Sequence, residues 1–351
     1  MNETMLALVY HGAHDLRLEN VPVPQIGTSE LLLRVNSASI CGTDLRIYHG
    51  NHRKYPEGTI RIPGHEIVGT ITSLGKNIQS FQAGQRVFIA PNIGCGHCRL
   101  CIAGKNNLCP NYQAIGVTLD GGFAEFMRVP EQAILQGNVM PISNSVDPAV
   151  AALTEPFACV LRGQNALAIQ PGNVVLIMGA GPIGIMHIKL ARLRGAGRII
   201  VSEPAEERIA QAIKTGADKV VNPVKEDLKE ILMNESNGAG ADAIIVAAPA
   251  HQAQESALQL AAIGGRINFF GGLPKDKPQI QVDSNLIHYK ELQITGTTAC
   301  STHDCWQAAE IINSGRVDLS EIISRRFPLS DALEAFNFVE QCTSLKVVIE
   351  P

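Results

Sequence analysis

The chain has 351 residues, a formal net charge of −4 at neutral pH and a hydrophobic content of 45%. These values predict a soluble globular protein with roughly two domains, and they exclude a disordered or fibrous chain. The slight excess of acidic residues provides no basic surface, so we expect neither nucleic acid nor an anionic membrane as a partner.

The segment up to about residue 150 has the pattern of short strands separated by turns. The strand-like runs are rich in β-branched and aromatic residues and are bounded by Gly, Pro and Asn clusters: LLLRV, GTITSLG, RVFIA and AEFMRV. We therefore predict a β-rich domain, in the form of a partly open barrel. An alanine-rich helical segment is expected to follow it, from Ala149 to Leu167.

Within this segment, four cysteines have the spacing of metal ligands. The pattern is C-x2-C-x2-C-x7-C, formed by Cys95, Cys98, Cys101 and Cys109. Thiolates at these intervals converge on one tetrahedral ion, and Zn²⁺ with four sulfurs is the usual closed structural site. The alternatives are a disulfide pair and a nucleic-acid-binding zinc ribbon, and the net charge argues against the ribbon. The spacing predicts a structural zinc site.

From Val174 onward, apolar strands alternate with helices. The expected strands are Val174–Met178, Arg198–Ser202, Lys219–Val221, Ala243–Ala247 and Arg266–Phe270. The expected helices are Pro182–Gly195, Glu206–Thr215, Lys225–Glu235 and Gln252–Ala261. This alternation predicts a doubly wound parallel sheet. After about Gly296, two helices and a closing strand, Lys346–Ile349, are expected to return to the first domain.

A glycine-rich loop follows the first of these strands and opens the first helix. It has the pattern G-x-G-x-x-G and consists of Gly179, Ala180, Gly181, Pro182, Ile183 and Gly184. Such a loop brings the backbone N–H groups of a helix N-terminus to the pyrophosphate of a dinucleotide. Glu203, at the end of the next strand, can accept hydrogen bonds from ribose hydroxyls, and Arg208 is a candidate neighbour of the adenosine. The alternative is a purely structural turn.

A second set of potential metal ligands lies in the β-rich segment. Cys41 begins the run Cys-Gly-Thr-Asp, and His65 and Glu66 follow Gly64. Cysteine, histidine and glutamate are common zinc ligands, and a catalytic zinc site uses three or four of them with an open position. Each residue alone has an ordinary structural explanation. Their presence beside a structural zinc pattern and a dinucleotide loop favours a catalytic metal.

These motifs together resemble the zinc-dependent medium-chain dehydrogenase/reductase family. The resemblance rests on GHEIVGTITSLG, the four-cysteine lobe and GAGPIG, in the expected order along the whole chain. RFPLSDALEAF and the Glu155-Pro156 pair resemble the sorbitol (polyol) dehydrogenase branch. The resemblance implies an α/β chain with a GroES-like β-rich catalytic domain, residues 1–155 with 296–351 returning to it. It also implies a Rossmann doubly wound parallel-sheet domain, residues 156–295.

The same resemblance implies roles for individual residues. Cys41, His65 and Glu66 would bind the catalytic zinc, with Glu155 as a fourth ligand, direct or through water. Thr43 would pass on the substrate proton. Asp44 would orient the histidine ligand, as such carboxylates commonly do.

The chain departs from the family pattern at two places. Arg46 stands where many relatives carry a proton-relaying histidine, and arginine does not give up its proton at neutral pH. His49 and His52 are possible substitutes. The stretch GTTACS lacks the arginine with which the polyol branch binds substrate, and it offers Thr297, Thr298 and Ser301 instead.

The sequence thus predicts an NAD-dependent zinc oxidoreductase of a polyol, with two zinc ions per chain. A polyol phosphate is a candidate if His52-Arg53-Lys54 binds phosphate, although a solvated loop is the favoured explanation of that run. The alternatives are an L-threonine or simple secondary-alcohol dehydrogenase and a non-catalytic zinc-binding relative. The family resemblance implies a homotetramer, with a homodimer as the alternative. We expect a cytoplasmic location, because the chain shows neither a signal peptide pattern nor a disulfide framework.

Overall fold

The structure is a computed structural model that describes residues 3–341 and 344–351. The chain divides into two compact units, Met1–Ala158 with Cys300–Pro351, and Cys159–Ala299. No helix in the described part of the chain is long and apolar enough to cross a membrane.

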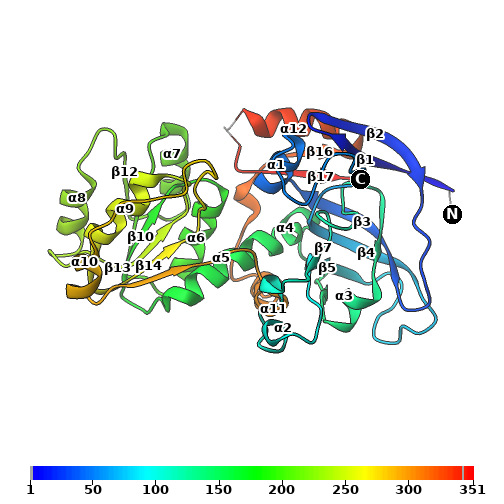
Figure 1. Ribbon diagram of the computed structural model, residues 1–351, viewed down its shortest axis with the longest axis horizontal. Helices are drawn as coiled ribbons and strands as arrows, with labels where there is room; N and C mark the ends of the chain where they lie inside the picture. The colour runs from blue at the N-terminus through cyan, green and yellow to red at the C-terminus, as the bar shows by residue number, and fades with distance from the viewer. Residues whose placement is uncertain (1–2, 342–343) are drawn as a thin grey trace. The chain divides into compact units, whose positions relative to one another are not determined.

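The first unit is built on a mixed β-sheet of seven strands (Figure 1). Six of them follow the order β16-β17-β3-β4-β5-β9, and β8 pairs with β3. The strands are β3 (Leu31–Ser39), β4 (Glu66–Leu74), β5 (Arg86–Ile89), β8 (Phe126–Val129), β9 (Val139–Pro141), β16 (Ile323–Pro328) and β17 (Lys346–Glu350). Two small antiparallel sheets accompany it, formed by β1 (Thr4–Gly12) with β2 (Asp15–Pro22) and by β6 (Asn92–Ile93) with β7 (Gln113–Ala114). The predicted β-rich domain is confirmed.

The helices of this unit are short. They are α1 (Gly42–Tyr48), α2 (Arg99–Ile102), η1 (Asn106–Leu108), α3 (Glu131–Leu135), α4 (Pro148–Ala152), the start of α5 (Thr154–Leu167), α11 (Thr302–Asn313), η2 (Ser320–Ile322), η3 (Leu329–Asp331) and α12 (Ala332–Glu340). The predicted helical segment Ala149–Leu167 is confirmed, and the chain forms it as two helices, α4 and α5, with a break at Leu153. Pro156 lacks the N–H that would continue α4, and proline is tolerated only in the first turn of a helix.

The C-terminal segment is part of the first unit's sheet. Strand β17 pairs antiparallel with β3, with Val348 opposite Ser39, and parallel with β16. Strand β16 was not predicted, since the run ISRRFP lacks an apolar alternation. Figure 1 shows the red C-terminal strand beside the blue strands of the same sheet. This pairing brings Lys346, the first residue of β17, to the end of β3.

The second unit is a six-stranded sheet in which all strands are parallel. Their order is β12-β11-β10-β13-β14-β15. The strands are β10 (Val174–Met178), β11 (Arg198–Ser202), β12 (Lys219–Val221), β13 (Ala241–Val246), β14 (Ala261–Phe269) and β15 (Gln293–Gly296). The helices are the rest of α5 with α6 (Pro182–Leu193), α7 (Glu206–Lys214), α8 (Leu228–Glu235), α9 (His251–Leu260) and α10 (Ser284–Tyr289). The predicted doubly wound parallel sheet is confirmed.

The structure differs from the prediction at two elements of this unit. Helix α8 begins at Leu228 rather than Lys225, because the Asp227 side chain caps it by accepting from the N–H groups of Lys229 and Glu230. Strand β15 was not predicted at all, since its short sequence QITG is largely exposed and carries no apolar run.

Candidate metal centres and coenzyme loop

The four cysteines of the predicted structural zinc site come together around α2. Three of their sulfur–sulfur distances are 3.5 Å for Cys98–Cys101, 3.8 Å for Cys98–Cys109 and 4.0 Å for Cys95–Cys101. A tetrahedral ion with zinc–sulfur bonds of about 2.3 Å needs sulfurs about 3.8 Å apart. The four thiols therefore fit a Zn²⁺ ion.

Backbone N–H groups favour the thiolate form of two of these cysteines. The N–H groups of His97 and Cys98 lower the pKa of Cys95 to about 6, and the N–H of Cys101 lowers the pKa of Cys98. Burial raises the pKa of the Cys101 thiol to about 12. Because zinc binds the thiolate, uptake of the ion releases the proton of Cys101. The His97 ring lies between these cysteines in the sequence. It donates a hydrogen bond from Nδ1 to the backbone carbonyl oxygen of Cys95 at 2.9 Å.

We expect Cys98→Ser to lose about one zinc ion per chain and to lower the melting temperature, because a structural zinc site contributes its binding free energy to folding. Metal analysis and thermal unfolding measure both effects. The matched control is His97→Ala, which should keep the full zinc content. Unchanged zinc content in Cys98→Ser would rule out the four-cysteine site.

The three residues predicted to bind the catalytic zinc also come together. Strand β3 ends at Ser39 and β4 begins at Glu66, and these two residues are paired in the antiparallel ladder. Cys41 follows β3 and His65 precedes β4, so both lie at the same end of the ladder. Ligand atoms of Cys41, His65 and Glu66 all lie within 4.8 Å of one another. Thiolate, imidazole and carboxylate are the ligands of catalytic zinc sites, so this donor set fits the ion.

The buried Asp44 carboxylate of α1 faces the imidazole of His65. Its Oδ2 accepts from the backbone N–H of Cys41 at 2.8 Å, and its Oδ1 lies 3.4 Å from Nδ1 of His65. Burial alone would lower the pKa of His65, but the charges of Asp44 and Cys41 outweigh burial and raise that pKa well above its usual value. Since Nδ1 faces Asp44, Nε2 is the ring nitrogen left for a metal ion. This geometry suits the orienting role expected of Asp44.

Glu66 has a partner that the sequence did not reveal. Nζ of Lys346 lies 2.6 Å from Oε1 of Glu66 and also contacts Oε2, to which the Ser39 hydroxyl donates. The Lys346 side chain is 5% exposed and that of Glu66 is fully buried. Burial raises the pKa of Glu66 to about 7, against the opposing charge of Lys346. A metal ion at this site therefore competes with Lys346 for the carboxylate.

Glu155 lies near the three ligands but does not belong to their group. It stands in the first turn of α5, is buried, and accepts a hydrogen bond at Oε1 from the buried thiol of Cys300 at 3.5 Å. Its charge is close enough to raise the pKa of Glu66. Within the described residues, its carboxylate is not among the ligand atoms that lie within 4.8 Å of one another around Cys41. This position suits an indirect role better than direct coordination.

Thr43, the expected proton-transfer residue, is hydrogen-bonded to Arg46. Both lie on α1, three residues apart and therefore on one face of the helix. Nη2 of Arg46 donates to Oγ1 of Thr43 at 2.9 Å. The residue that departs from the family pattern is thus in direct contact with the threonine.

Neither histidine considered as a substitute proton carrier is well placed for that task. Nε2 of His49 lies 3.0 Å from a carboxylate oxygen of Glu340. Burial, and next the charges of Arg46 and Arg53, lower the pKa of His52 to about 4. At neutral pH the His52 ring is therefore neutral and holds an added proton only weakly.

The glycine-rich loop of the second unit connects β10 to α6. Gly179 has φ of 105°, which favours glycine, and a Cβ on Gly184 would lie 1.9 Å from the carbonyl oxygen of Gly179. Gly181 caps α6, whose first turn contains Pro182 and Ile183. A Cβ on Gly181 would meet no described protein atom within 4 Å, so open space lies before the helix N-terminus. The loop therefore fits the phosphates of a dinucleotide.

Glu203 follows β11 and binds this loop. Its Oε2 accepts from the backbone N–H of Ala180 at 2.7 Å, and its Oε1 accepts from Ala205 at 3.0 Å. The residue is 3% exposed. Ribose binding through Glu203 would use the remaining lone pairs of these oxygens. Arg208 lies half-buried in the first turn of α7.

The comparisons with known proteins cover the whole chain. The alcohol dehydrogenase GroES-like domain matches residues 27–141, and the zinc-binding dehydrogenase domain matches residues 182–314. An L-threonine 3-dehydrogenase from Pyrococcus abyssi (strain GE5 / Orsay) is 35% identical over 99% of each chain. The chain belongs to the zinc-dependent medium-chain dehydrogenase family. An L-threonine 3-dehydrogenase from Bacillus subtilis (strain 168) is 33% identical over 97% of this dehydrogenase and 96% of the relative.

Solved structures agree with this fold. An alcohol dehydrogenase from Thermus sp. ATN1 has a TM-score of 0.90 and 27% identity, with 99% of each chain covered. A short chain alcohol dehydrogenase from E. coli CFT073 in complex with NADH has a TM-score of 0.90 and 27% identity, with 100% of each chain covered. A protein from Sinorhizobium meliloti 1021 bound to NADP has the same TM-score and coverage at 30% identity. Because neighbours bind both coenzymes, the choice between them must be argued from this dehydrogenase's own residues.

The family assignment confirms the predicted zinc-dependent dehydrogenase class and its fold. It does not confirm the polyol branch, since the relatives reported above are L-threonine 3-dehydrogenases. Sequence reasoning also missed Lys346 and Cys300 as neighbours of the site. A lysine directly before the apolar run Val347–Ile349 of the strand KVVIE was the available signal for Lys346.

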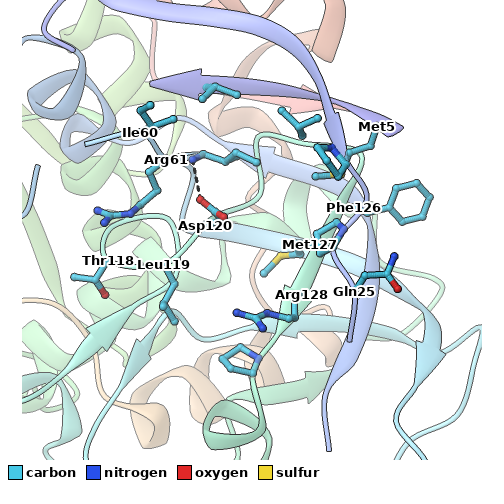
Figure 2. Close-up of a pocket in the computed structure, with 17 residues that line it drawn as sticks. Met5, Gln25, Ile60, Arg61, Thr118, Leu119, Asp120, Phe126, Met127 and Arg128 are labelled. Carbon is cyan, nitrogen blue, oxygen red and sulfur yellow. Dashed lines mark hydrogen bonds between the residues drawn. The ribbon is translucent and has the colours of Figure 1, made fainter. Parts of the chain in front are cut away.

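The first unit also contains a cavity of about 630 Å³ that is separate from these residues (Figure 2). Two of its charged side chains bind backbone: Asp120 accepts from the N–H of Ile62 at 3.1 Å, and Arg61 donates to the carbonyl oxygen of Val117 at 2.6 Å. The remaining lining is largely apolar. The predicted catalytic residues do not line this cavity.

Proposed function

We propose that this dehydrogenase oxidises a secondary alcohol with NAD, and that L-threonine or a similar 2-amino-3-hydroxy acid is the first candidate substrate. The main support for the proposal is that ligand atoms of Cys41, His65 and Glu66 all lie within 4.8 Å of one another. Three protein ligands with an open position are the pattern of catalytic zinc. The bound ion would supply Lewis-acid polarisation of the alcohol oxygen, and the coenzyme would supply the hydride acceptor.

The chain's own residues then have defined tasks. Asp44 holds the imidazole of His65 in one orientation. Oγ1 of Thr43 receives the substrate proton while the same hydroxyl releases its own. Arg46 cannot take that proton, because its guanidinium remains fully protonated. Since His49 is bound to Glu340 and the pKa of His52 is low, we propose that the proton leaves Thr43 directly to solvent.

Two substrate classes compete within this proposal. L-Threonine is favoured by relatives that match nearly the full length of the chain at 33–35% identity. A polyol, including a polyol phosphate, was the expectation from the Glu155-Pro156 pair, and the buried Glu155 carboxylate near Glu66 still suits a hydroxylated substrate. Absorbance of NADH at 340 nm over a panel of L-threonine, sorbitol, sorbitol 6-phosphate and 2,3-butanediol separates them. No oxidation of any of these secondary alcohols would contradict the proposal.

Removing the Thr43 hydroxyl should lower kcat strongly. A positioned proton-transfer group typically contributes about 10²–10⁴-fold, so Thr43→Ala should lose a factor in that range. Thr43→Ser keeps the hydroxyl and should keep much of the rate. The measurement is kcat with the best substrate of the panel. A wild-type kcat in Thr43→Ala would exclude the threonine from proton transfer.

We further propose NAD rather than NADP as the coenzyme. The buried Glu203 carboxylate stands at the loop, where it can accept from a ribose hydroxyl but repels a 2′-phosphate. Glu203→Ala should weaken the preference for NAD, as measured by kcat/KM with each coenzyme. Arg208→Ala is the companion variant, because an arginine there could instead pair with a phosphate. A wild-type preference for NADP would overturn this assignment.

The expected assembly as a homotetramer or homodimer and the expected cytoplasmic location stay predictions. Size-exclusion chromatography with light scattering measures the first, and cell fractionation measures the second.

A further inference from the structure

Arg46 brings a fixed positive charge to the proposed reaction site. It is exposed on α1, and its Nη2 donates to Oγ1 of Thr43 at 2.9 Å. An arginine has five N–H donors in a rigid planar fork, of which this contact uses one. The guanidinium is therefore held beside the hydroxyl that we expect to contact the substrate alcohol.

A second exposed arginine, Arg53, lies next to His52 in the chain. Burial, and next the charges of Arg46 and Arg53, lower the pKa of His52. Among the residues that the structure describes, no carboxylate forms an ion pair with Arg46 or Arg53.

The nearby acidic group does not neutralise this charge. Asp44 opposes the pKa shift of His52, but its Oδ2 accepts from the backbone N–H of Cys41 and its Oδ1 faces His65. Lys54 is turned elsewhere, with Nζ 5.6 Å from the centre of the Tyr112 ring. The positive charge beside Thr43 thus comes from Arg46, which contacts its hydroxyl.

A guanidinium cannot serve as the proton relay at this position, since it does not deprotonate near neutral pH. It does match carboxylate and phosphate groups, which it binds through paired N–H donors. We propose that Arg46 binds an anionic group of the substrate and so selects alcohols that carry a carboxylate or a phosphate near the reacting carbon. Arg46 is then a specificity-determining residue. This inference rests on the proposed secondary-alcohol oxidation and narrows its substrate class.

The test compares substrates that differ only in the charged group. L-Threonine is paired with L-threoninamide, and sorbitol 6-phosphate is paired with sorbitol. A charge-assisted hydrogen bond contributes about 1.5–3 kcal/mol, so kcat/KM for the anionic member should exceed that of its uncharged partner by about 10- to 100-fold, mostly through KM. The pair that shows the difference identifies the anion as carboxylate or phosphate.

Variants decide whether Arg46 is responsible. Arg46→Ala should bring the ratio within the responding pair close to one, and Arg46→Lys should retain part of it. The ratio cancels any effect of Arg46 on Thr43, because both members of a pair use the same hydroxyl. Arg316→Ala removes an exposed arginine after α11 and should leave the ratio unchanged.

The outcomes separate this inference from the proposed function. Equal kcat/KM within both pairs, or an unchanged ratio in Arg46→Ala, would overturn the inference while leaving the dehydrogenase activity intact. If no alcohol is oxidised, the proposed function fails. Calorimetric titration of the zinc-loaded protein with inorganic phosphate and with L-threonine then decides the inference. Binding weakened about tenfold or more in Arg46→Ala supports it, and equal binding or no binding contradicts it.

Discussion

Substitution of His65 by alanine, or of Cys41 by serine, is expected to lower NAD-dependent turnover by about 10³-fold or more. The reason is the loss of a ligand of the catalytic zinc, whose polarisation of an alcohol oxygen is worth several kcal/mol, at about 1.36 kcal/mol for each factor of ten. Both side chains lie at the end of the β3–β4 ladder, whereas the glycine-rich loop belongs to the other unit. NADH binding, measured by fluorescence titration, should therefore be retained.

The matched control for this experiment is His303→Ala, which removes an exposed histidine of α11 in the same unit. It should keep the wild-type rate. Turnover within about tenfold of wild type in His65→Ala would mean that this histidine is not a ligand of a catalytic metal.

The second large effect concerns stability rather than catalysis. Lys346→Met should lower the free energy of unfolding by about 3–5 kcal/mol, the usual cost of removing one partner of a buried ion pair. Lys346 contacts both carboxylate oxygens of Glu66, and both side chains are almost fully buried. Methionine fills a similar volume but leaves the Glu66 carboxylate without its positive partner. Denaturant unfolding of the metal-free protein, in which no ion competes with Lys346 for the carboxylate, measures the loss.

Two further variants separate the ion pair from packing. Lys346→Arg keeps the charge and should lose less stability than Lys346→Met. The double variant Glu66→Gln/Lys346→Met removes both charges and should recover part of the loss, because the two residues act as a coupled pair. A loss below about 1 kcal/mol in Lys346→Met would show that Lys346 is not the partner of Glu66 in the metal-free protein.

Motifs in which spacing alone determines geometry could be read from the sequence. The four-cysteine lobe spans few residues, so its sulfurs have little choice of partner, and the glycine-rich loop is defined by the strand and helix on either side of it. Spacing alone could not predict that Cys41 and His65 lie close together, because their distance depends on the β3–β4 register, which pairs Ser39 with Glu66.

The individual side-chain partners of residues in distant segments could not be predicted. Lys346 and Glu66 are 280 residues apart, and Cys300 and Glu155 are 145 apart. No local pattern connects such pairs, since the pairing of β17 with β3 and the position of α5 are decided by packing of the whole unit. The substrate class was uncertain for a related reason. It depends on a few side chains such as Arg46, whose direction and partner only the folded chain defines.

The central claim is that Cys41, His65 and Glu66 hold a zinc ion distinct from the one in the four-cysteine lobe. Zinc content per chain, measured by atomic emission on purified wild type and His65→Ala, tests it most directly. We predict about two zinc ions per chain in the wild type and about one in His65→Ala, with the lobe still occupied. Equal zinc content in the two proteins would contradict the claim.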